Sequence, residues 1–152
     1  TSFLAPTVSD ARDVTERIGY KKNGYGMNTA DIVTKTPVEE IVGNALTDGL
    51  TQNGHAVSES GKYSIISAIK KFWFETDVNF FTVEFTGEIL ASLELLNNET
   101  NEVVYKSDYS GTHSEKKAGG LNKTWERIMS KAVDKLVEDI VYDEELAEAI
   151  EQ

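Results

Sequence analysis

A long amphipathic segment near the end of the chain is the sequence feature that most constrains the fold. Its apolar residues recur at intervals of one, three and four, which places them on one face of an α-helix. They are Leu121, Trp125, Ile128, Met129, Ala132, Val133, Leu136, Val137 and Ile140. Because such a face must be buried against another layer, the rest of the chain has to supply that layer.

Alternation of apolar and polar residues between positions 82 and 96 predicts a strand with one buried face. A turn at 97–101 and a second alternating run at 103–109 predict its antiparallel partner. The β-rich run at 63–75 is too continuous for a strand with one buried face, so we expect both of its faces to be covered. These three runs form a predicted meander.

A second helix is predicted over residues 37–52. Thr36 is a favourable N-cap residue, and Pro37 is favourable at the first helical position. Glu39, three residues after Thr36, would complete a capping box. Gly54 can adopt the left-handed conformation that ends a helix. Near the C-terminus, Asp143 is expected to cap a separate short helix, and Gly119-Gly120 form a flexible entry to the long helix.

The first residues predict a strand and a hairpin. Residues 3–8 form a short strand that leads into a polar turn, and Pro6 favours a sheet edge. Asn23-Gly24 is the strongest tight-turn signal in the sequence, so residues 17–20 and 27–33 are the arms of an exposed hairpin. A crossover through the first helix favours parallel pairing of the strands on either side.

The predicted fold is therefore α+β. We expect a mixed, mainly antiparallel sheet of about four strands with two helices packed on one face. The element order is strand, helix, strand, strand, strand, helix, with an N-terminal hairpin-like insert. The 152 residues fit a single domain, 1–152, and include no apolar stretch of about 18 residues that could span a membrane.

Composition excludes several classes of function. With 15 Lys+Arg against 26 Asp+Glu the net charge is −11, which disfavours nucleic-acid binding. Much of the acidity lies at the C-terminus, where segment 143–152 is either a solvated helix end or a tail for a basic partner. The chain has no cysteine, so disulfides and thiolate chemistry are excluded.

No motif for catalysis is recognisable. His55 and His113 are isolated from each other and from carboxylates at zinc-binding spacing. The glycines do not form a phosphate-binding loop, and no nucleophile elbow occurs. We therefore expect neither a metal, nor a cofactor, nor an enzymatic activity.

Two groups of residues are candidates for an interaction surface. Arg17, Tyr20, Lys21, Lys22 and Tyr25 form a basic, aromatic loop in an acidic chain, which suits a protein partner or anionic headgroups. A solvated hairpin tip is the simpler interpretation of the same residues. Arg12 is a separate, single candidate, because its guanidinium could bind an anion. A local salt-bridged turn explains Arg12 more simply.

Three consecutive aromatic residues form the second group. Phe72, Trp73 and Phe74 lie in one predicted strand, so their side chains must point to both faces of the sheet. If the face away from the helices is open, the exposed aromatic is an interaction patch. Burial beneath the hairpin insert is the alternative.

The order of motifs resembles the uncharacterised bacterial lipoprotein family typified by YajG. The resemblance is carried by Asp10-Ala11-Arg12, Ile18-Gly19, residues 45–50, residues 53–57, Ile69-Lys70-Lys71-Phe72-Trp73, and Gly111 after the last strand. It implies a periplasmic domain held at the outer membrane by a lipidated N-terminal Cys. That Cys would be expected just before Thr1 and is absent from this sequence.

Two functions follow from this resemblance and from the candidate residues. The first is a tethered, non-enzymatic module that docks on an envelope protein through residues 17–25 and the 72–74 strand. The alternative is an auxiliary of an envelope transport system that carries a lipid or apolar ligand in a groove lined by Phe72, Trp73 and Phe74. A cytoplasmic location is the alternative to the periplasm.

Overall fold

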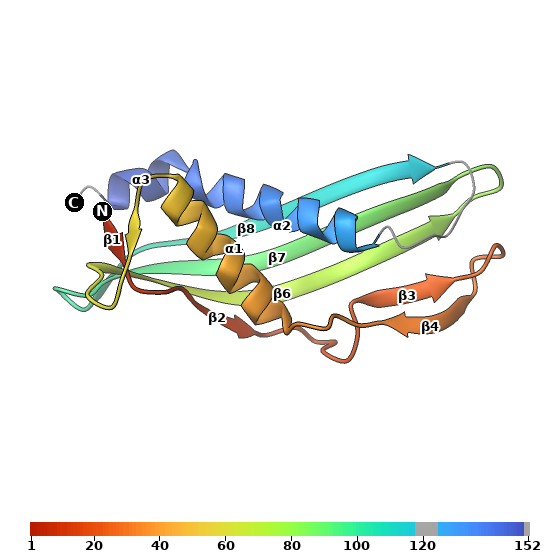
Figure 1. Ribbon diagram of the computed structural model, residues 1–152, viewed down its shortest axis with the longest axis horizontal. Helices are drawn as coiled ribbons and strands as arrows, with labels where there is room; N and C mark the ends of the chain where they lie inside the picture. The colour runs from red at the N-terminus through yellow and green to blue at the C-terminus, as the bar shows by residue number, and fades with distance from the viewer. Residues whose placement is uncertain (118–124, 151–152) are drawn as a thin grey trace.

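Three long antiparallel strands form the centre of the computed structural model, which describes residues 1–117 and 125–150. They are β6 (Tyr63–Val78), β7 (Val83–Asn97) and β8 (Glu102–Lys117), and they run nearly the whole length of an elongated, curled sheet (Figure 1). The predicted meander is confirmed, and its strands are longer than the alternating patterns indicated.

Three short strands pair along the free edge of β6, and two more pair with these. β1 (Ser2–Phe3) and β2 (Thr7–Asp10) pair with β6 in parallel, and β5 (Ala56–Val57) pairs with β1. The predicted N-terminal strand is thus interrupted around Pro6, which has no N–H to donate to a sheet. The parallel pairing of β2 and β6 around the first helix is as predicted.

The predicted hairpin is β3 (Gly19–Lys22) with β4 (Asn28–Ile32). β3 joins β6 through Gly19 opposite Phe74, so the hairpin extends the sheet and does not cover it. Within the described ranges the sheet consequently has eight strands, and the prediction of about four was wrong. A partner strand of 16 residues has room along one edge for several short strands.

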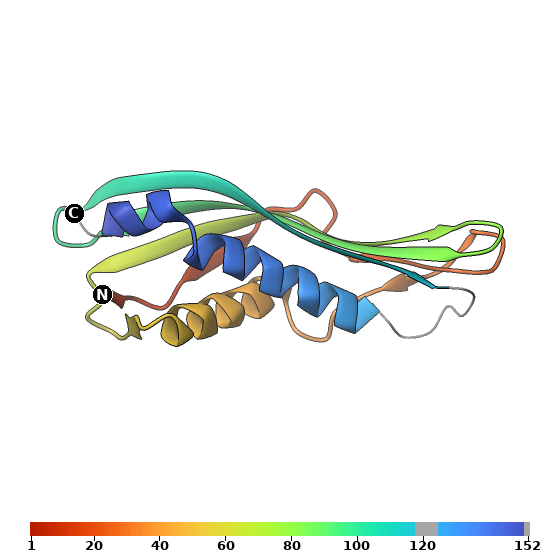
Figure 2. The same cartoon turned by 90° about the horizontal axis from the view of Figure 1, so that it is seen from above.

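The three helices of the described residues all cover one face of the sheet (Figure 2). They are α1 (Val38–Gln52), α2 (Trp125–Val141) and α3 (Glu144–Ile150). The two predicted helices are therefore present on one face, together with the short third helix. None of the helices in the described ranges is long and apolar enough to cross a membrane.

Two of the predicted helix caps are confirmed, those at Gly54 and Asp143. Gly54 has a φ of +88° and its N–H donates to the Thr51 carbonyl, as the prediction of a left-handed C-cap requires. The Asp143 carboxylate accepts the backbone N–H of Glu145 at 2.9 Å and so caps α3. Gly119-Gly120 and Leu121 lie outside the described residues.

The predicted capping box of α1 is wrong. Pro37, with an extended ψ of 140°, is itself the N-cap, and it makes no side-chain cap hydrogen bond. Its carbonyl instead accepts from the N–H groups of Glu40 and Ile41. Thr36 therefore lies one residue too early to reach the first turn.

Only one face of β6 is covered, which corrects the expectation that both would be. Ile65, Ile69 and Phe72 are buried beneath the helices, whereas Ile66 on the opposite face is 39% exposed. A β-bulge shifts the register between Ile69 and Lys71. Because the bulge changes the phase of the alternation, the apolar run looks continuous in the sequence.

Gly111 marks the place where α2 comes closest to the sheet. It lies inside β8, opposite Ile89, and not after the last strand as the sequence suggested. A Cβ at this position would clash with the Ala132 carbonyl oxygen and would lie 2.8 Å from Leu136 Cβ. Only glycine leaves space for the helix backbone here.

We expect Gly111→Ala to lower the free energy of unfolding by about 1–3 kcal/mol, because the helix must move away from β8. Urea unfolding monitored by circular dichroism measures this change. Gly24→Ala is the matched control, because no atom lies within 4 Å of an added Cβ there. Equal unfolding midpoints for the two variants would contradict the close approach.

Candidate interaction surface

An aromatic pair joins the β3–β4 hairpin to the middle of β6. The rings of Tyr20 and Trp73 meet edge to face, with centroids 5.8 Å apart. The Arg17 guanidinium lies 5.2 Å from the Tyr20 ring centroid and forms an ion pair with Asp31 at 3.2 Å. This places a cation, a phenol and an indole in one contiguous cluster.

Glu75 contacts this cluster through hydrogen bonds to its carboxylate. Its carboxylate accepts a hydrogen bond from Trp73 Nε1 at 2.7 Å and another from Lys22 Nζ at 3.0 Å. Burial raises the pKa of Glu75, but the hydrogen bonds from Trp73 and Lys22 outweigh it, and the pKa lies below its ordinary value. We call Arg17, Tyr20, Lys22, Trp73 and Glu75 the outer-face cluster.

The outer-face cluster lies on the side of the sheet that the helices leave uncovered. The rest of this face carries cross-strand ion pairs, such as Lys106 with Glu94 at 3.2 Å and Lys116 with Glu84 at 3.6 Å. Paired charges of this kind are typical of a solvated sheet face. Ile66 and Leu90 are also exposed on this face, but the aromatic pair with Arg17 beside it has the composition that best suits a contact with another molecule.

The structure brings together four of the nine residues predicted from the sequence, namely Arg17, Tyr20, Lys22 and Trp73. Glu75 is the fifth member of the outer-face cluster and was missed, although its position two residues after Trp73 places it on the same face. The hairpin lies beside Trp73 and does not bury it.

The other five predicted residues lie elsewhere. Phe72 and Phe74 point to the helix side and are buried. Lys21 lies outside the outer-face cluster and lines a groove on the helix side, which Tyr20 and Lys22 also reach. Tyr25 is exposed at the hairpin tip. The Arg12 guanidinium forms a local ion pair with Asp10 at 2.8 Å, which is the salt-bridged turn that the sequence favoured.

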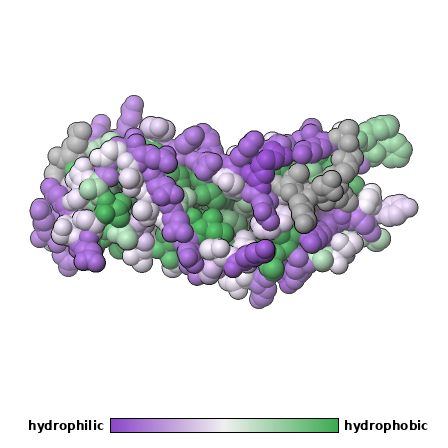
Figure 3. Space-filling view, in the orientation of Figure 1, coloured by the Kyte–Doolittle hydropathy of each residue, from purple (hydrophilic) through white to green (hydrophobic). Residues whose placement is uncertain are grey.

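A groove runs between the helices and the hairpin on the inner side of the sheet. One part, of about 520 Å³, has Phe72 and Met129 in its lining, and a second part, of about 510 Å³, has Phe74 and Phe85. Trp125 lines both parts. Figure 3 shows apolar surface between hydrophilic ridges in the middle of this face. Trp73 does not line the groove, which corrects the sequence-based expectation.

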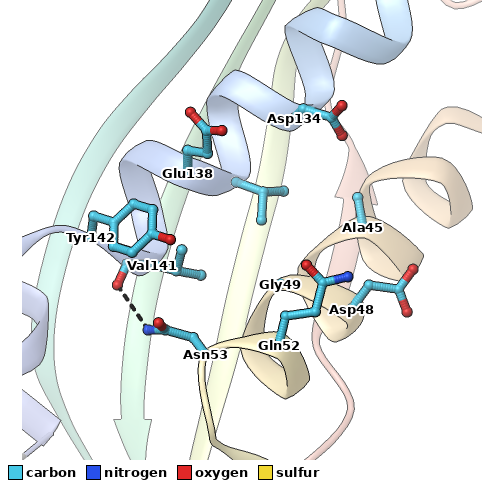
Figure 4. Close-up of a pocket in the computed structure, with 10 residues that line it drawn as sticks. Ala45, Asp48, Gly49, Gln52, Asn53, Asp134, Glu138, Val141 and Tyr142 are labelled. Carbon is cyan, nitrogen blue, oxygen red and sulfur yellow. Dashed lines mark hydrogen bonds between the residues drawn. The ribbon is translucent and has the colours of Figure 1, made fainter.

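A third cavity, of about 520 Å³, lies between the C-terminal halves of α1 and α2 (Figure 4). It exposes the carboxylates of Asp48, Asp134 and Glu138, and Asn53 Nδ2 donates to the Val141 carbonyl at 3.3 Å across it. Across residues 1–117 and 125–150, no three His, Cys, Asp or Glu side chains are grouped to hold a metal ion.

The hydrogen bond between Trp73 and Glu75 predicts a pH-dependent fluorescence signal. In a Trp125→Phe background, Trp73 emission is expected to shift as Glu75 is protonated, with a midpoint below the ordinary pKa of 4.5. The stabilisation from this carboxylate is present above pH 4.5 and is lost as the pH falls through the lowered pKa. Fluorescence titration measures the midpoint, and the same transition in Glu75→Gln would show that another group is responsible.

The fold is shared with solved structures of low sequence identity. A Xanthomonas campestris protein is 11% identical with a TM-score of 0.64, and the match covers 99% of this chain and 86% of that one. A neuraminyllactose-binding hemagglutinin homolog from Helicobacter pylori is 11% identical with a TM-score of 0.50, covering 97% and 84%. A hypothetical protein from Chlamydia trachomatis is 7% identical with a TM-score of 0.50, covering 99% and 94%.

No curated protein sequence matches the chain. The sequence profile of a family described as uncharacterized lipoprotein does match, over residues 3–151. That description carries no enzymatic activity, and a lipoprotein family implies a membrane-anchored location on the envelope side. The match over nearly the whole chain agrees with the motif order of the sequence. This chain belongs to the uncharacterized lipoprotein family of YajG.

Proposed function

We propose that this domain is a non-enzymatic accessory module of the cell envelope that docks on a partner protein through the outer-face cluster. The observation that carries the proposal is the ring pair of Tyr20 and Trp73 on a sheet face that none of the described helices covers. Trp, Tyr and Arg are the residue types that contribute most to protein interfaces, and Arg17 completes that set.

The arrangement of the cluster favours a protein as the partner. The Trp73 ring is held by its bond to Glu75, and Tyr20 is held between Arg17 and Trp73, so little side-chain entropy remains to be lost on docking. Charges of both signs surround the rings, which suits a mixed polar rim around an aromatic centre. An anionic surface would have to compete with Asp31 and Glu75, because these carboxylates already pair with Arg17 and Lys22.

The proposal places the domain in the periplasm, tethered to the outer membrane by lipid on an N-terminal Cys of the full-length protein. Mass analysis of the full-length product for a diacylated Cys tests this tether. An unmodified product in the cytoplasm would contradict it.

The double variant Tyr20→Ala/Trp73→Ala is expected to lose its protein partner. Removal of two central aromatics costs at least about tenfold in affinity, because each such side chain contributes about 1–2 kcal/mol or more at an interface. Crosslinked envelope extracts of the full-length lipoprotein, analysed by mass spectrometry, measure the retained partners.

Ile66→Ala is the matched control for this experiment, because Ile66 is an apolar residue on the same face and outside the cluster. Thermal melts of all variants show whether the fold is intact. The docking proposal fails if the double variant retains the same partners as the wild-type protein and the control.

The inner groove supports a second candidate function, the binding of a lipid or other apolar ligand. Phe72, Phe74 and Phe85 form an aromatic lining, and Lys35 at the junction of its two parts could pair with an anionic headgroup. The lining combines these rings with charged side chains such as Lys21, Lys22 and Glu126, which suits an amphipathic ligand that has an apolar body and a charged head.

Ser130→Trp is expected to fill the groove, because Ser130 is exposed and lines it. Native mass spectrometry of protein purified from membranes would then detect an apolar ligand on the wild-type protein and on Ser130→Ala, but not on Ser130→Trp. If no lipid is found on the wild-type protein, or the ligand persists in Ser130→Trp, the groove is not a ligand site.

A further inference from the structure

Two exposed aromatic rings form the tip of the long β6–β7 hairpin. The side chains of Phe80 and Phe81 are 92% and 82% exposed, and their rings contact each other with centroids 4.7 Å apart. The turn that carries them is closed by a hydrogen bond of 2.9 Å from the Asn79 N–H to the Thr82 carbonyl. The two rings therefore form one convex apolar surface on an ordered turn.

The tip of the β3–β4 hairpin lies beside this turn. Tyr25 and Met27 at that tip are 90% and 59% exposed. A Cβ at Gly26 would lie 3.7 Å from Val78 Cβ, and Lys22 Nζ donates to the Thr76 carbonyl at 2.7 Å. We call Tyr25, Met27, Phe80 and Phe81 the aromatic tip.

The aromatic tip is free of charge in a chain of which 27% is charged. Residues 23–30 and 78–83 contain no acidic or basic residue, and the charges resume immediately outside them. The flanks carry Lys21, Lys22, Asp77 and Glu84, and Lys117 lies opposite Val83 on β8. A cap that is apolar, convex and uncharged can enter a medium of low dielectric without desolvating an ion.

We propose that the aromatic tip inserts into the interfacial region of a lipid bilayer. Aromatic side chains with a polar edge, such as Tyr25, favour the level of the headgroups, and the two phenylalanines can reach the acyl boundary. A bilayer adapts to a convex cap, and the mixed charges of the flanks remain at the level of water and headgroups.

The aromatic tip lies far from the chain ends. Figures 1 and 2 place Thr1 and the last helix at one end of the molecule and the two hairpin tips at the other. The 16 residues of β6 alone span roughly 50 Å. Insertion of the tip is therefore a membrane contact separate from any contact at the N-terminus, and none of the four residues of the aromatic tip belongs to the outer-face cluster.

Cosedimentation of the 152-residue chain with vesicles of phosphatidylethanolamine and phosphatidylglycerol tests the proposal. We expect the wild-type chain to pellet with vesicles and Phe80→Ser/Phe81→Ser to bind at least about tenfold more weakly, since burial of one Phe is worth about a tenfold change. Tyr25→Ser/Met27→Ser should weaken binding less. Binding should persist in about 1 M salt, where charge interactions are screened within about 3 Å.

Tyr142→Ser is the matched control, because Tyr142 is 72% exposed and lies between α2 and α3, away from the tip. Thermal melts equal to wild type show that each variant is folded. The proposal is overturned if the wild-type chain stays in the supernatant or if Phe80→Ser/Phe81→Ser pellets equally well. It is also overturned if sedimentation velocity without vesicles shows a dimer that this variant abolishes, because the tip is then an interface between copies.

Discussion

Burial of the apolar face of α2 against β7 and β8 is the interaction on which the rest of the structure depends. Its buried side chains pack where Gly87 and Gly111 leave space, and an added Cβ at either glycine would meet α2 at less than 3.0 Å. This contact determines which face of the long meander is dry. All three helices lie on that side, and the opposite face of the sheet is left to solvent and to partners.

The three candidate functional surfaces lie in different places relative to the helix-covered face of the sheet. The outer-face cluster lies on the uncovered face, where the ion pairs Arg17–Asp31 and Lys22–Glu75 flank the Tyr20–Trp73 pair. The inner groove lies where the helices and the hairpin leave the sheet incompletely filled, and Phe72 and Phe74 contribute to its lining. The aromatic tip lies at the end that the helices do not reach.

Periodicity predicted the elements well, because α2 and β7 each bury one continuous stripe. It failed where a local irregularity or a distant partner decides the structure. The bulge between Ile69 and Lys71 made β6 look covered on both faces, and strands as short as β1 have no pattern apart from their pairing. Tyr20 and Trp73 were both predicted as surface candidates, but 52 intervening residues hid their contact. Phe80 and Phe81 were not identified, because only the structure shows that they are exposed.

Photo-crosslinking in cells from a probe amino acid at position 73 of the full-length lipoprotein tests the docking function most directly. A probe there projects from the sheet face opposite the helices, beside Tyr20. Docking through the outer-face cluster predicts one discrete protein adduct, and the same adduct should be absent when the probe is placed at Ile66. A lipid adduct alone, or no adduct, would contradict a protein partner on this face.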